Sequence, residues 1–279
     1  MPFVGVLPER ESLFRPQPRR AVAVSDAAAW RLNPVHRRVY DKLALALAEG
    51  LLAAPCGVSP MVLGLAPETP VFVKPIINLA GMALEAGVSR ADAVPVRPGS
   101  FWCERLEGEQ TSSDLLLESG RIRWQAHTRA GQWRDQGRPC VWEVGVAIPA
   151  IEPVLAQLVD RHLADYTGLC NIELIGGRPV EIHLRGSNGF FDLYGPGFVP
   201  AWVTLVDGAP FVPPPPVPGG MVISVFGRRP LSGEESEALA ALGVSVSEDR
   251  HTPDRVAILR ATDRAIGRAA LALLERRRG

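Results

Sequence analysis

A glycine turn between two apolar-rich runs constrains the fold of this chain more than any other stretch. The runs Leu169 to Ile175 and Val180 to Leu184 flank Gly176-Gly177-Arg178, and a short glycine-containing link between β-type runs predicts a β-hairpin. Successive side chains of a strand point to opposite faces, so alternation decides which residues share a face. If residues 176 to 178 form the loop, Glu173 lies directly across from Glu181.

The same alternation divides the other side chains of the hairpin between its two faces. Asn171, His183 and Arg185 share a face with the two glutamates, while the opposite face is apolar. Two carboxylates that face each other repel, so they require a shared proton, a cation or a hard divalent ion such as magnesium. Two interpretations remain open: a metal site, or a solvated face on which the glutamates pair with Arg178 and Arg185.

Lysine is rare in this chain, and both lysines lie upstream of the hairpin. Lys42 and Lys74 are the only lysines among 30 basic residues, so each is a candidate for binding phosphate through a compact ammonium. Val71 to Pro75 predicts a short strand that ends at Lys74. Lys42 falls in a helix predicted from Pro34 through Glu49. For Lys42, a local surface ion pair with Asp41 is the alternative interpretation.

Four sequence blocks, in this order, resemble the ATP-grasp fold of the carboxylate–amine ligases. They are Tyr40-Asp41-Lys42 at the opening of a helix, Val73-Lys74-Pro75 at the end of a strand, Phe101 to Glu109 as a hinge, and the hairpin with Glu173 and Glu181. The resemblance covers roughly residues 31 to 195. It implies an α+β fold in which two subdomains hold ATP between them.

The resemblance assigns one group of residues to the nucleotide. The lysines are expected to bind its phosphates, backbone groups of the hinge to contact the adenine edge, and a carboxylate after the hinge to reach the ribose. The residues implied for ATP are Lys42, Lys74, Glu104, Arg105, Leu106 and Glu109. The alternative interpretation of the hinge block is a polar hairpin edge that binds no ligand.

A second group of residues is implied for Mg²⁺ and for the substrate. Glu173 and Glu181 are expected to hold the metal, with His183 and Asn188 as rival third ligands because Mg²⁺ prefers oxygen to imidazole. Arg185 is expected to face the developing charge or the acid, which makes it the candidate catalytic residue. The residues implied for the substrate are Arg185, Ser187 and Asn188.

The activity implied by the resemblance is ATP-dependent and Mg²⁺-dependent. A carboxylate is activated as an acyl phosphate and joined to an amine or another nucleophile, with release of ADP and phosphate. Two departures keep other interpretations open. The family's metal strand usually reads Glu-Ile-Asn-Pro-Arg, where this chain has Glu181-Ile-His183-Leu-Arg185, and the loop after Lys74 is poorer in glycine and serine. The alternatives are a degenerate module that binds nucleotide or a partner without turnover, and a phosphotransferase.

A proline-rich stretch at residues 209–220 predicts a linker and the main domain boundary. Before it we expect an N-terminal arm at 1–25 and an ATP-grasp domain at 26–208, with a smaller lobe at 26–104 and a larger lobe at 105–208. After it, strand and helix patterns predict a small α/β unit at 221–279. This unit is expected to replace the α/β domain that ATP-grasp enzymes usually carry before the grasp, or to serve as a packing appendage or homodimer contact.

Composition limits the partners and the compartment that we expect. The formal net charge of +0 argues against broad electrostatic binding of nucleic acid or of an anionic membrane. No apolar run reaches the roughly 18 residues of a membrane-spanning helix and no signal-peptide pattern is present, so we expect a cytoplasmic protein. The expected partners are small-molecule or peptide carboxylates and amines. Widely spaced cysteines predict buried free thiols rather than a metal site or disulfides.

Overall fold

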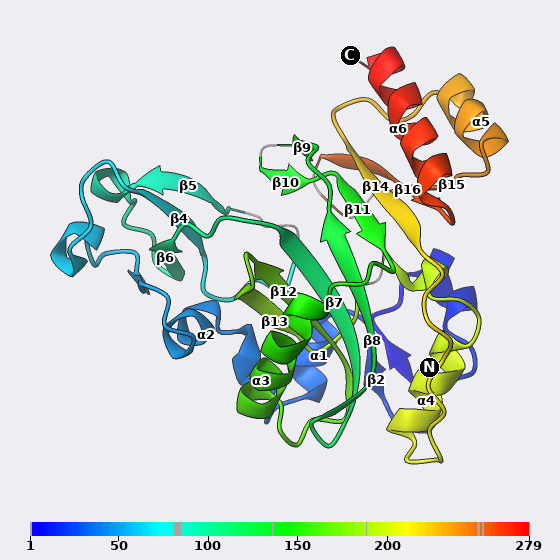
Figure 1. The fold of residues 1–279 in the computed structure, drawn as a ribbon, viewed down its shortest axis with the longest axis horizontal. Coiled ribbons are helices and arrows are strands. Elements are labelled where there is room, and N and C mark those ends of the chain that lie inside the picture. Colours follow the sequence, from blue (N-terminus) through cyan, green and yellow to red (C-terminus); the bar gives the residue numbers. More distant parts are fainter. Residues whose placement is uncertain are drawn as a thin grey trace.

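An eight-stranded and a four-stranded antiparallel sheet organise the chain in this computed structural model, which describes residues 2–80, 85–135, 137–187, 189–249, 252 and 254–278 (Figure 1). Helices pack against these sheets, so the α+β class expected from the sequence is confirmed. The smaller sheet extends to one side of the larger one in Figure 1. The two meet near the predicted hairpin, where a side chain from the smaller sheet bonds to the larger one.

The strands of the two sheets come from separate parts of the chain. The larger sheet has the order β13-β12-β7-β8-β11-β14-β16-β15, with β7 (Gln110–Glu118), β8 (Arg121–Ala130), β11 (Val141–Val144), β12 (Gly168–Ile175), β13 (Arg178–His183), β14 (Gly220–Phe226), β15 (Ser245–Glu248) and β16 (Arg255–Ala261). The smaller sheet has the order β3-β6-β4-β5, with β3 (Ala53–Pro55), β4 (Pro70–Pro75), β5 (Gly87–Arg90) and β6 (Ser100–Glu104). Two short pairs complete the set: β1 (Phe3–Val4) with β2 (Val22–Ala23), and β9 (Arg134–Asp135) with β10 (Arg138–Pro139).

The helices are mostly short and flank the sheets. The α-helices are α1 (Asp26–Leu32), α2 (Lys42–Ala48), α3 (Glu152–His162), α4 (Phe198–Val206), α5 (Gly233–Ala241) and α6 (Arg264–Arg278). Short 3₁₀ helices lie at Pro8–Leu13, Arg37–Tyr40, Pro60–Leu63, Ala91–Ala93, Pro149–Ile151 and Phe191–Leu193. No helix in the described ranges combines the length and the apolar composition needed to span a bilayer.

The two faces of the larger sheet pack into different apolar clusters, as strand alternation requires. On β7, Leu115 and Leu117 pack in one cluster with α3, whereas Leu116 packs in the other with α4. Phe3 and Phe14 of the N-terminal segment are buried in the α4 cluster. Further along that second face the residues become polar, and this polar end carries the two glutamates of the hairpin.

The predicted hairpin is present as β12 and β13, and Glu173 lies opposite Glu181 as expected. The turn between the strands is shorter than expected. Gly176 and Gly177 alone connect them, at φ of +57° and +77°. Positive φ at both central residues gives the hairpin turn that follows the twist of its strands, and glycine adopts it without strain. The expected three-residue loop at 176–178 is therefore wrong, because residue 178 already belongs to β13.

A β-bulge in β13 restores the pairing of the two glutamates despite the shorter turn. Leu174 pairs with Pro179, whereas Glu173 pairs with Glu181, so Val180 is the extra residue. Proline is tolerated next to a bulge because it cannot donate to the ladder in any case. The groups of an extra residue lie outside the regular ladder. The Val180 carbonyl can therefore accept a hydrogen bond from outside the sheet.

The helix predicted from 34 through 49 is divided into two pieces. A 3₁₀ turn ends at Tyr40, and Asp41 has extended backbone angles before α2 begins. The Asp41 carboxylate accepts a hydrogen bond of 2.8 Å from the backbone N–H of Ala44, which is the contact of an N-cap residue. The expected single helix is therefore wrong, while the expected helix opening at Lys42 is confirmed.

The C-terminal segment continues the larger sheet. β14 pairs with β11 of the preceding segment and with β16, so β14, β16 and β15 extend the sheet beyond β11. Helices α5 and α6 lie against this end of the sheet in Figure 1. A capping box between Ser232 and Glu235 starts α5. Residues 210–219 form neither helix nor strand; the division into domains stays a prediction.

Candidate active site

Glu173, Glu181 and His183 bring three potential metal ligands together on the polar face of the hairpin. One ligand atom from each lies within 4.8 Å of the other two. Nε2 of His183 is 3.6 Å from Oε2 of Glu181. Ligand atoms bound to one ion at about 2.0–2.6 Å lie at most about 4–5 Å apart, so a single ion can contact all three. The donor set of two carboxylates and one imidazole fits a divalent cation.

Lys74 reaches this face from β4 of the smaller sheet. Its Nζ donates a hydrogen bond of 3.0 Å to the carbonyl of Val180, the extra residue of the bulge. The side chain is buried, and burial lowers the pKa of Lys74 because it disfavours the charged ammonium. No carboxylate within the described ranges forms an ion pair with Lys74. A buried ammonium whose partner is a neutral carbonyl favours the binding of an anion.

Lys42 approaches the same cluster from the first turn of α2. Its Nζ forms an ion pair with Oε2 of Glu181, and its side chain is buried. The alternative surface pair with Asp41 is wrong, because Lys42 is buried and pairs with Glu181, while the Asp41 carboxylate caps α2. The two lysines therefore converge on the glutamate pair from the smaller sheet and from the helix beside it.

The solvated-face interpretation of the hairpin is also wrong. Arg178 pairs with Glu104 at 3.1 Å, and Arg185 pairs with Asp26 at 2.8 Å, so neither arginine forms its ion pair with Glu173 or Glu181. The Glu181 side chain retains 20% of its exposure and His183 is buried. The two glutamates are thus half-buried, and the charge of Glu181 is balanced by Lys42 and His183.

Burial and mutual repulsion separate the pKa values of the two glutamates. Burial raises the pKa of Glu173, and the neighbouring charge of Glu181 raises it further, to about 7. Burial acts on Glu181 in the same direction, but the charges of His183 and Lys42 outweigh it and hold the pKa of Glu181 well below its usual range. Glu181 is therefore ionised at neutral pH, and Glu173 is the carboxyl that takes up a proton first.

A buried carboxylate that the sequence did not single out positions His183. Oδ1 of Asp26, the first residue of α1, is 2.9 Å from Nδ1 of His183 and accepts a hydrogen bond of 2.9 Å from the Tyr40 hydroxyl. Oδ2 of Asp26 accepts one of 2.8 Å from Nη2 of Arg185. Burial acts to raise the pKa of Asp26, but the charges of Arg185 and His183 outweigh it and hold this pKa below its usual range. Asp26 is therefore an ionised anchor for two cations.

The charges around His183 keep its ring protonated in the metal-free protein. Burial and the nearby Arg185 act to lower the pKa of His183, but Asp26 and Glu181 outweigh them and raise it to about 9. At neutral pH the ring donates through Nδ1 to Asp26 and presents Nε2 to Glu181. A metal ion at this position would take the place of the Nε2 proton.

The predicted hinge residues lie where β6 leaves the smaller sheet. Glu104 uses its carboxylate within the protein, because Oε1 accepts a hydrogen bond of 2.9 Å from the backbone N–H of Leu52 and Oε2 pairs with Arg178. The backbone groups of Arg105 and Leu106 make no hydrogen bond to any residue that the structure describes. These groups are available to a ligand such as an adenine edge, which is the role that the sequence predicts.

The hinge and the glycine turn of the hairpin pack directly on each other. The backbone N–H of Gly176 donates a hydrogen bond of 2.9 Å to the carbonyl of Glu109. A Cβ on Gly176 would lie 2.2 Å from the carbonyl oxygen of Glu107, so the position requires glycine. The Glu109 carboxylate pairs with Arg129, whose Nε is 2.7 Å from Oε2. To bind a ribose, as predicted, Glu109 would exchange this partner for hydroxyl groups.

The residues predicted for the substrate follow β13. Arg185 turns its guanidinium to Asp26, and Nη1 donates a hydrogen bond of 3.3 Å to the Gly186 carbonyl. The backbone N–H of Ser187 lies 3.1 and 2.9 Å from the two carboxylate oxygens of Asp114. Asn188, the rival metal ligand and candidate substrate residue, lies outside the described residues. The roles of Arg185 and Ser187 stay predictions.

Asp114 is the second buried carboxylate whose place the sequence did not reveal. Asp114 lies in the middle of β7, opposite Asn171. It accepts hydrogen bonds of 2.7 Å from Nδ2 of Asn171 and 3.0 Å from the Tyr194 hydroxyl, besides the one from Ser187. Burial raises the pKa of Asp114, and its hydrogen bonds offset this effect only in part. The run of polar residues 111–114 within a strand was the available signal.

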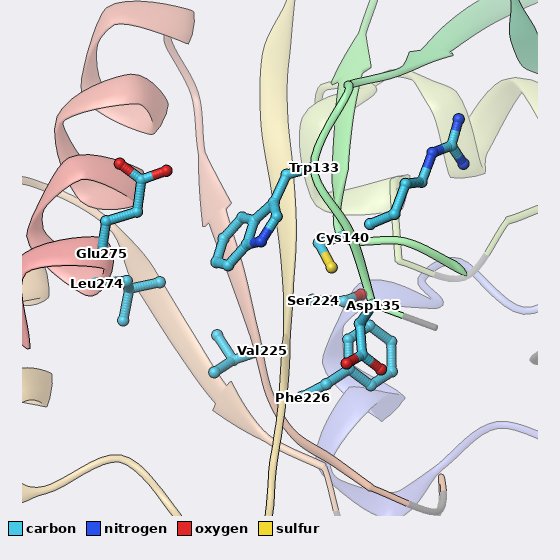
Figure 2. Close-up of a pocket in the computed structure, with 9 residues that line it drawn as sticks. Trp133, Asp135, Cys140, Ser224, Val225, Phe226, Leu274 and Glu275 are labelled. Atoms are coloured by element: carbon cyan, nitrogen blue, oxygen red, sulfur yellow. The ribbon is translucent and has the colours of Figure 1, made fainter. Parts of the chain in front are cut away.

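A separate cavity lies away from these residues. It has a volume of about 400 Å³ and is lined by residues that include Trp133, Cys140, Phe226 and Leu274 (Figure 2). Figure 2 shows the indole of Trp133 between α6 and the segment that carries Cys140. Strand β14, which contributes to the lining, is separated from β12 by β7, β8 and β11. None of the residues predicted for ATP, metal or substrate lines this cavity.

Comparison with known proteins adds evidence on the fold. No family model and no curated protein matches the chain. Among solved structures, carboxyaminoimidazole ribonucleotide synthase from Aspergillus clavatus, complexed with ATP, matches with a TM-score of 0.64 at 10% identity, over 86% of this chain and 74% of its own. An N5-carboxyaminoimidazole ribonucleotide synthetase from Thermus thermophilus gives 0.61 at 15% identity, over 98% and 86%.

A third similar structure has a different substrate in its name. The L-amino acid ligase from Bacillus licheniformis matches with a TM-score of 0.60 at 13% identity, over 90% of this chain and 75% of its own. These proteins are carboxylate–amine ligases of the ATP-grasp superfamily. At such low identity the likeness establishes the fold alone. The chain has the ATP-grasp fold, and the resemblance drawn from its sequence is confirmed at that level.

Proposed function

We propose that the chain is an ATP-dependent enzyme that activates a carboxylate as an acyl phosphate and joins it to an amine. The observation that carries this proposal is the buried ammonium of Lys74, which lacks an ion pair among the described residues and lies beside Glu173 and Glu181. An ammonium next to paired carboxylates is suited to phosphate groups bridged by a divalent ion. The fold supports the proposal, because similar structures were solved with ATP and with ADP.

The proposed nucleotide site draws on both sheets. Lys74 and Lys42 bind phosphate oxygens, and Lys42 exchanges its pair with Glu181 for a phosphate. The backbone of Arg105 and Leu106 contacts the adenine edge. Glu173 and Glu181 hold a divalent ion, and the charge of that ion offsets the charge of the phosphoryl group. The remaining nucleotide contacts that we propose are those of Glu104 and Glu109.

The proposed reaction has two transfers. A carboxylate oxygen of the acid attacks the γ-phosphorus of ATP and ADP leaves; the amine then attacks the acyl carbon and phosphate leaves. The protein's contribution is to position the groups and to stabilise charge. Arg185 is proposed to face the acid while Asp26 holds it through Nη2, and the loop at Ser187, fixed by Asp114, is proposed to bind the substrate carboxylate.

The reaction can be tested without knowledge of the amine. Protein, ATP and a divalent ion are incubated with a panel of amino acids and small polycarboxylates, and hydroxylamine is added to trap the activated acid. We expect ADP and a hydroxamate with at least one acid. Formation of AMP and pyrophosphate would contradict the proposal, and so would phosphoryl transfer to an acceptor with no trapped acid, which would favour the phosphotransferase.

The role of Lys74 can be tested by nucleotide binding. A charge-assisted hydrogen bond contributes about 1.5–3 kcal/mol, so Lys74→Ala is expected to weaken ATP binding roughly 10- to 150-fold by calorimetry. Arg90→Ala, which removes an exposed cation of the smaller sheet, is the control and should leave the affinity unchanged. Equal affinity of Lys74→Ala and wild type would remove Lys74 from the site. Tight ATP binding without ADP formation would favour the module without turnover.

A further inference from the structure

His183 is built into the candidate site in the manner of a metal-binding histidine. Its Nδ1 is engaged by Oδ1 of Asp26 at 2.9 Å, and Asp26 is fixed in turn by Tyr40 and Arg185. The Tyr40 ring packs against the imidazole edge to face, with centroids 5.9 Å apart. A carboxylate on one ring nitrogen sets the orientation of the ring and leaves the other nitrogen for a metal. The other nitrogen, Nε2, faces Glu181.

The donor set also distinguishes between possible ions. Mg²⁺ favours an all-oxygen shell, whereas imidazole nitrogen suits first-row transition ions. Zn²⁺ sites are mostly tetrahedral and rich in nitrogen or sulfur, while Mn²⁺ accepts carboxylate, water and phosphate oxygens as Mg²⁺ does. A site of two carboxylates and one imidazole, with further positions left for phosphate oxygens, therefore matches Mn²⁺ better than it matches Mg²⁺ or Zn²⁺.

We propose that Nε2 of His183, positioned by Asp26, is the third ligand of the Glu173–Glu181 site and makes it select Mn²⁺ over Mg²⁺. This rests on the proposed function in one respect, since it uses the same pair of glutamates. Asp26 is a positioning residue here, because it acts on the ion through the imidazole ring.

The proposal can be tested by binding alone, with no substrate. Protein stripped with a chelator is titrated with Mn²⁺, free Mn²⁺ is followed by electron paramagnetic resonance, and Mg²⁺ is added as competitor. We expect wild type to bind Mn²⁺ more tightly than Mg²⁺. His183→Asn replaces the imidazole nitrogen by an amide oxygen, and we expect it to lower the Mn²⁺ to Mg²⁺ affinity ratio by about 10-fold or more. The matched control is His162→Asn, which alters the last residue of α3, a histidine that pairs with Glu49. This variant should keep the Mn²⁺ to Mg²⁺ affinity ratio of wild type.

A second measurement needs no variant and therefore does not depend on the folding of one. Pulsed electron paramagnetic resonance of the Mn²⁺-loaded wild type should show coupling to an imidazole nitrogen. In a separate titration, Asp26→Asn should weaken Mn²⁺ binding more than Mg²⁺ binding. Absence of nitrogen coupling, or an unchanged affinity ratio in His183→Asn, would overturn the proposal. In either case hydroxamate formation with Mg²⁺ would leave the proposed function standing, whereas absence of any divalent-ion binding would contradict both.

Discussion

Asp26 and Asp114 are both buried carboxylates that accept hydrogen bonds from three groups, yet their surroundings act on them in opposite ways. Asp26 is surrounded by His183, Arg185 and the Tyr40 hydroxyl, two of which are cations. Asp114 is surrounded by the amide of Asn171, the backbone N–H of Ser187 and the hydroxyl of Tyr194, which are all neutral donors. The pKa of the first carboxyl is lowered and that of the second is raised.

The difference shows what each kind of partner can offset. Neutral donors recover part of the hydration that a buried carboxylate loses, but the pKa of Asp114 stays above its usual value. Adjacent cations reverse the effect of burial at Asp26. Asp26 therefore serves to hold charged groups at the candidate site, whereas Asp114 serves to fix the loop that follows β13.

The largest effect is expected from removing the charge of Asp26. Asp26→Asn leaves His183 and Arg185 without their buried anion, and breaking a buried ion pair costs about 3–5 kcal/mol. The free energy of unfolding of the metal-free protein should fall by that amount in chemical denaturation. A loss below about 1 kcal/mol would mean that the two cations find other partners, and the comparison with Asp114 would fail.

A smaller effect, with a characteristic pH dependence, is expected from Asp114→Asn. The amide nitrogen cannot accept, so one buried donor loses its partner at a cost of about 1–3 kcal/mol. Burial raises the pKa of Asp114 in the folded state, so wild type loses stability as pH rises above about 4, the unfolded value. Asparagine does not titrate, and the stability difference between the two proteins should therefore shrink as pH rises above about 4.

The measurement for Asp114 must account for its neighbours. Tyr194 donates to it, Cys170 lies close enough to sense its charge, and the charge of Arg185 acts to lower its pKa. Denaturation curves at each pH should be collected for wild type and for Asp114→Asn in parallel, so that titration common to both cancels. A difference that grows as pH rises would show that Asp114 is ionised in the folded protein at acid pH.

The smallest effect is the expected difference in stability loss between two tyrosine substitutions, Tyr40→Phe and Tyr194→Phe. Tyr40→Phe removes a donor to an ionised carboxylate and also the acceptor of the Leu184 backbone N–H, whereas Tyr194→Phe removes a donor to a carboxyl whose pKa is raised. Hydrogen bonds to charged groups contribute about 1.5–3 kcal/mol and neutral ones about 0.5–1.5 kcal/mol, so Tyr40→Phe should cost about 1 kcal/mol more. Thermal denaturation of both variants, with Tyr166→Phe as a third buried hydroxyl, would reveal the order; equal costs would contradict it.

Local pattern was sufficient to predict the hairpin and the convergence of its glutamates. Alternation of apolar and polar residues fixed the faces of β12 and β13, and the scarcity of lysine drew attention to Lys42 and Lys74. The bulge at Val180 was missed, because an inserted residue leaves little trace in a short alternating run. The pairing of Glu173 with Glu181 was thus predicted correctly from a loop of the wrong length.

The remaining parts of the candidate site depend on contacts between distant segments. Asp26 directly follows Ser25, the N-cap of α1, and in sequence it is no more than an acidic residue of a first helical turn. Its partner His183 lies 157 positions away, and no periodicity spans that separation. Asp114 could have been suspected, since a charged residue within an otherwise apolar strand requires a partner, but the partner itself could not be inferred.

The separation of Asp26 from His183 also has a consequence for the order in which the protein forms. During synthesis at about 5–20 residues per second, the α1 segment waits roughly ten to thirty seconds before residue 183 is made. Until then Asp26 has neither cation beside it and remains hydrated, so α1 cannot dock in its final position. Closure of such a long loop is entropically slow, which places the docking of α1 on the finished β12–β13 hairpin among the late steps of folding.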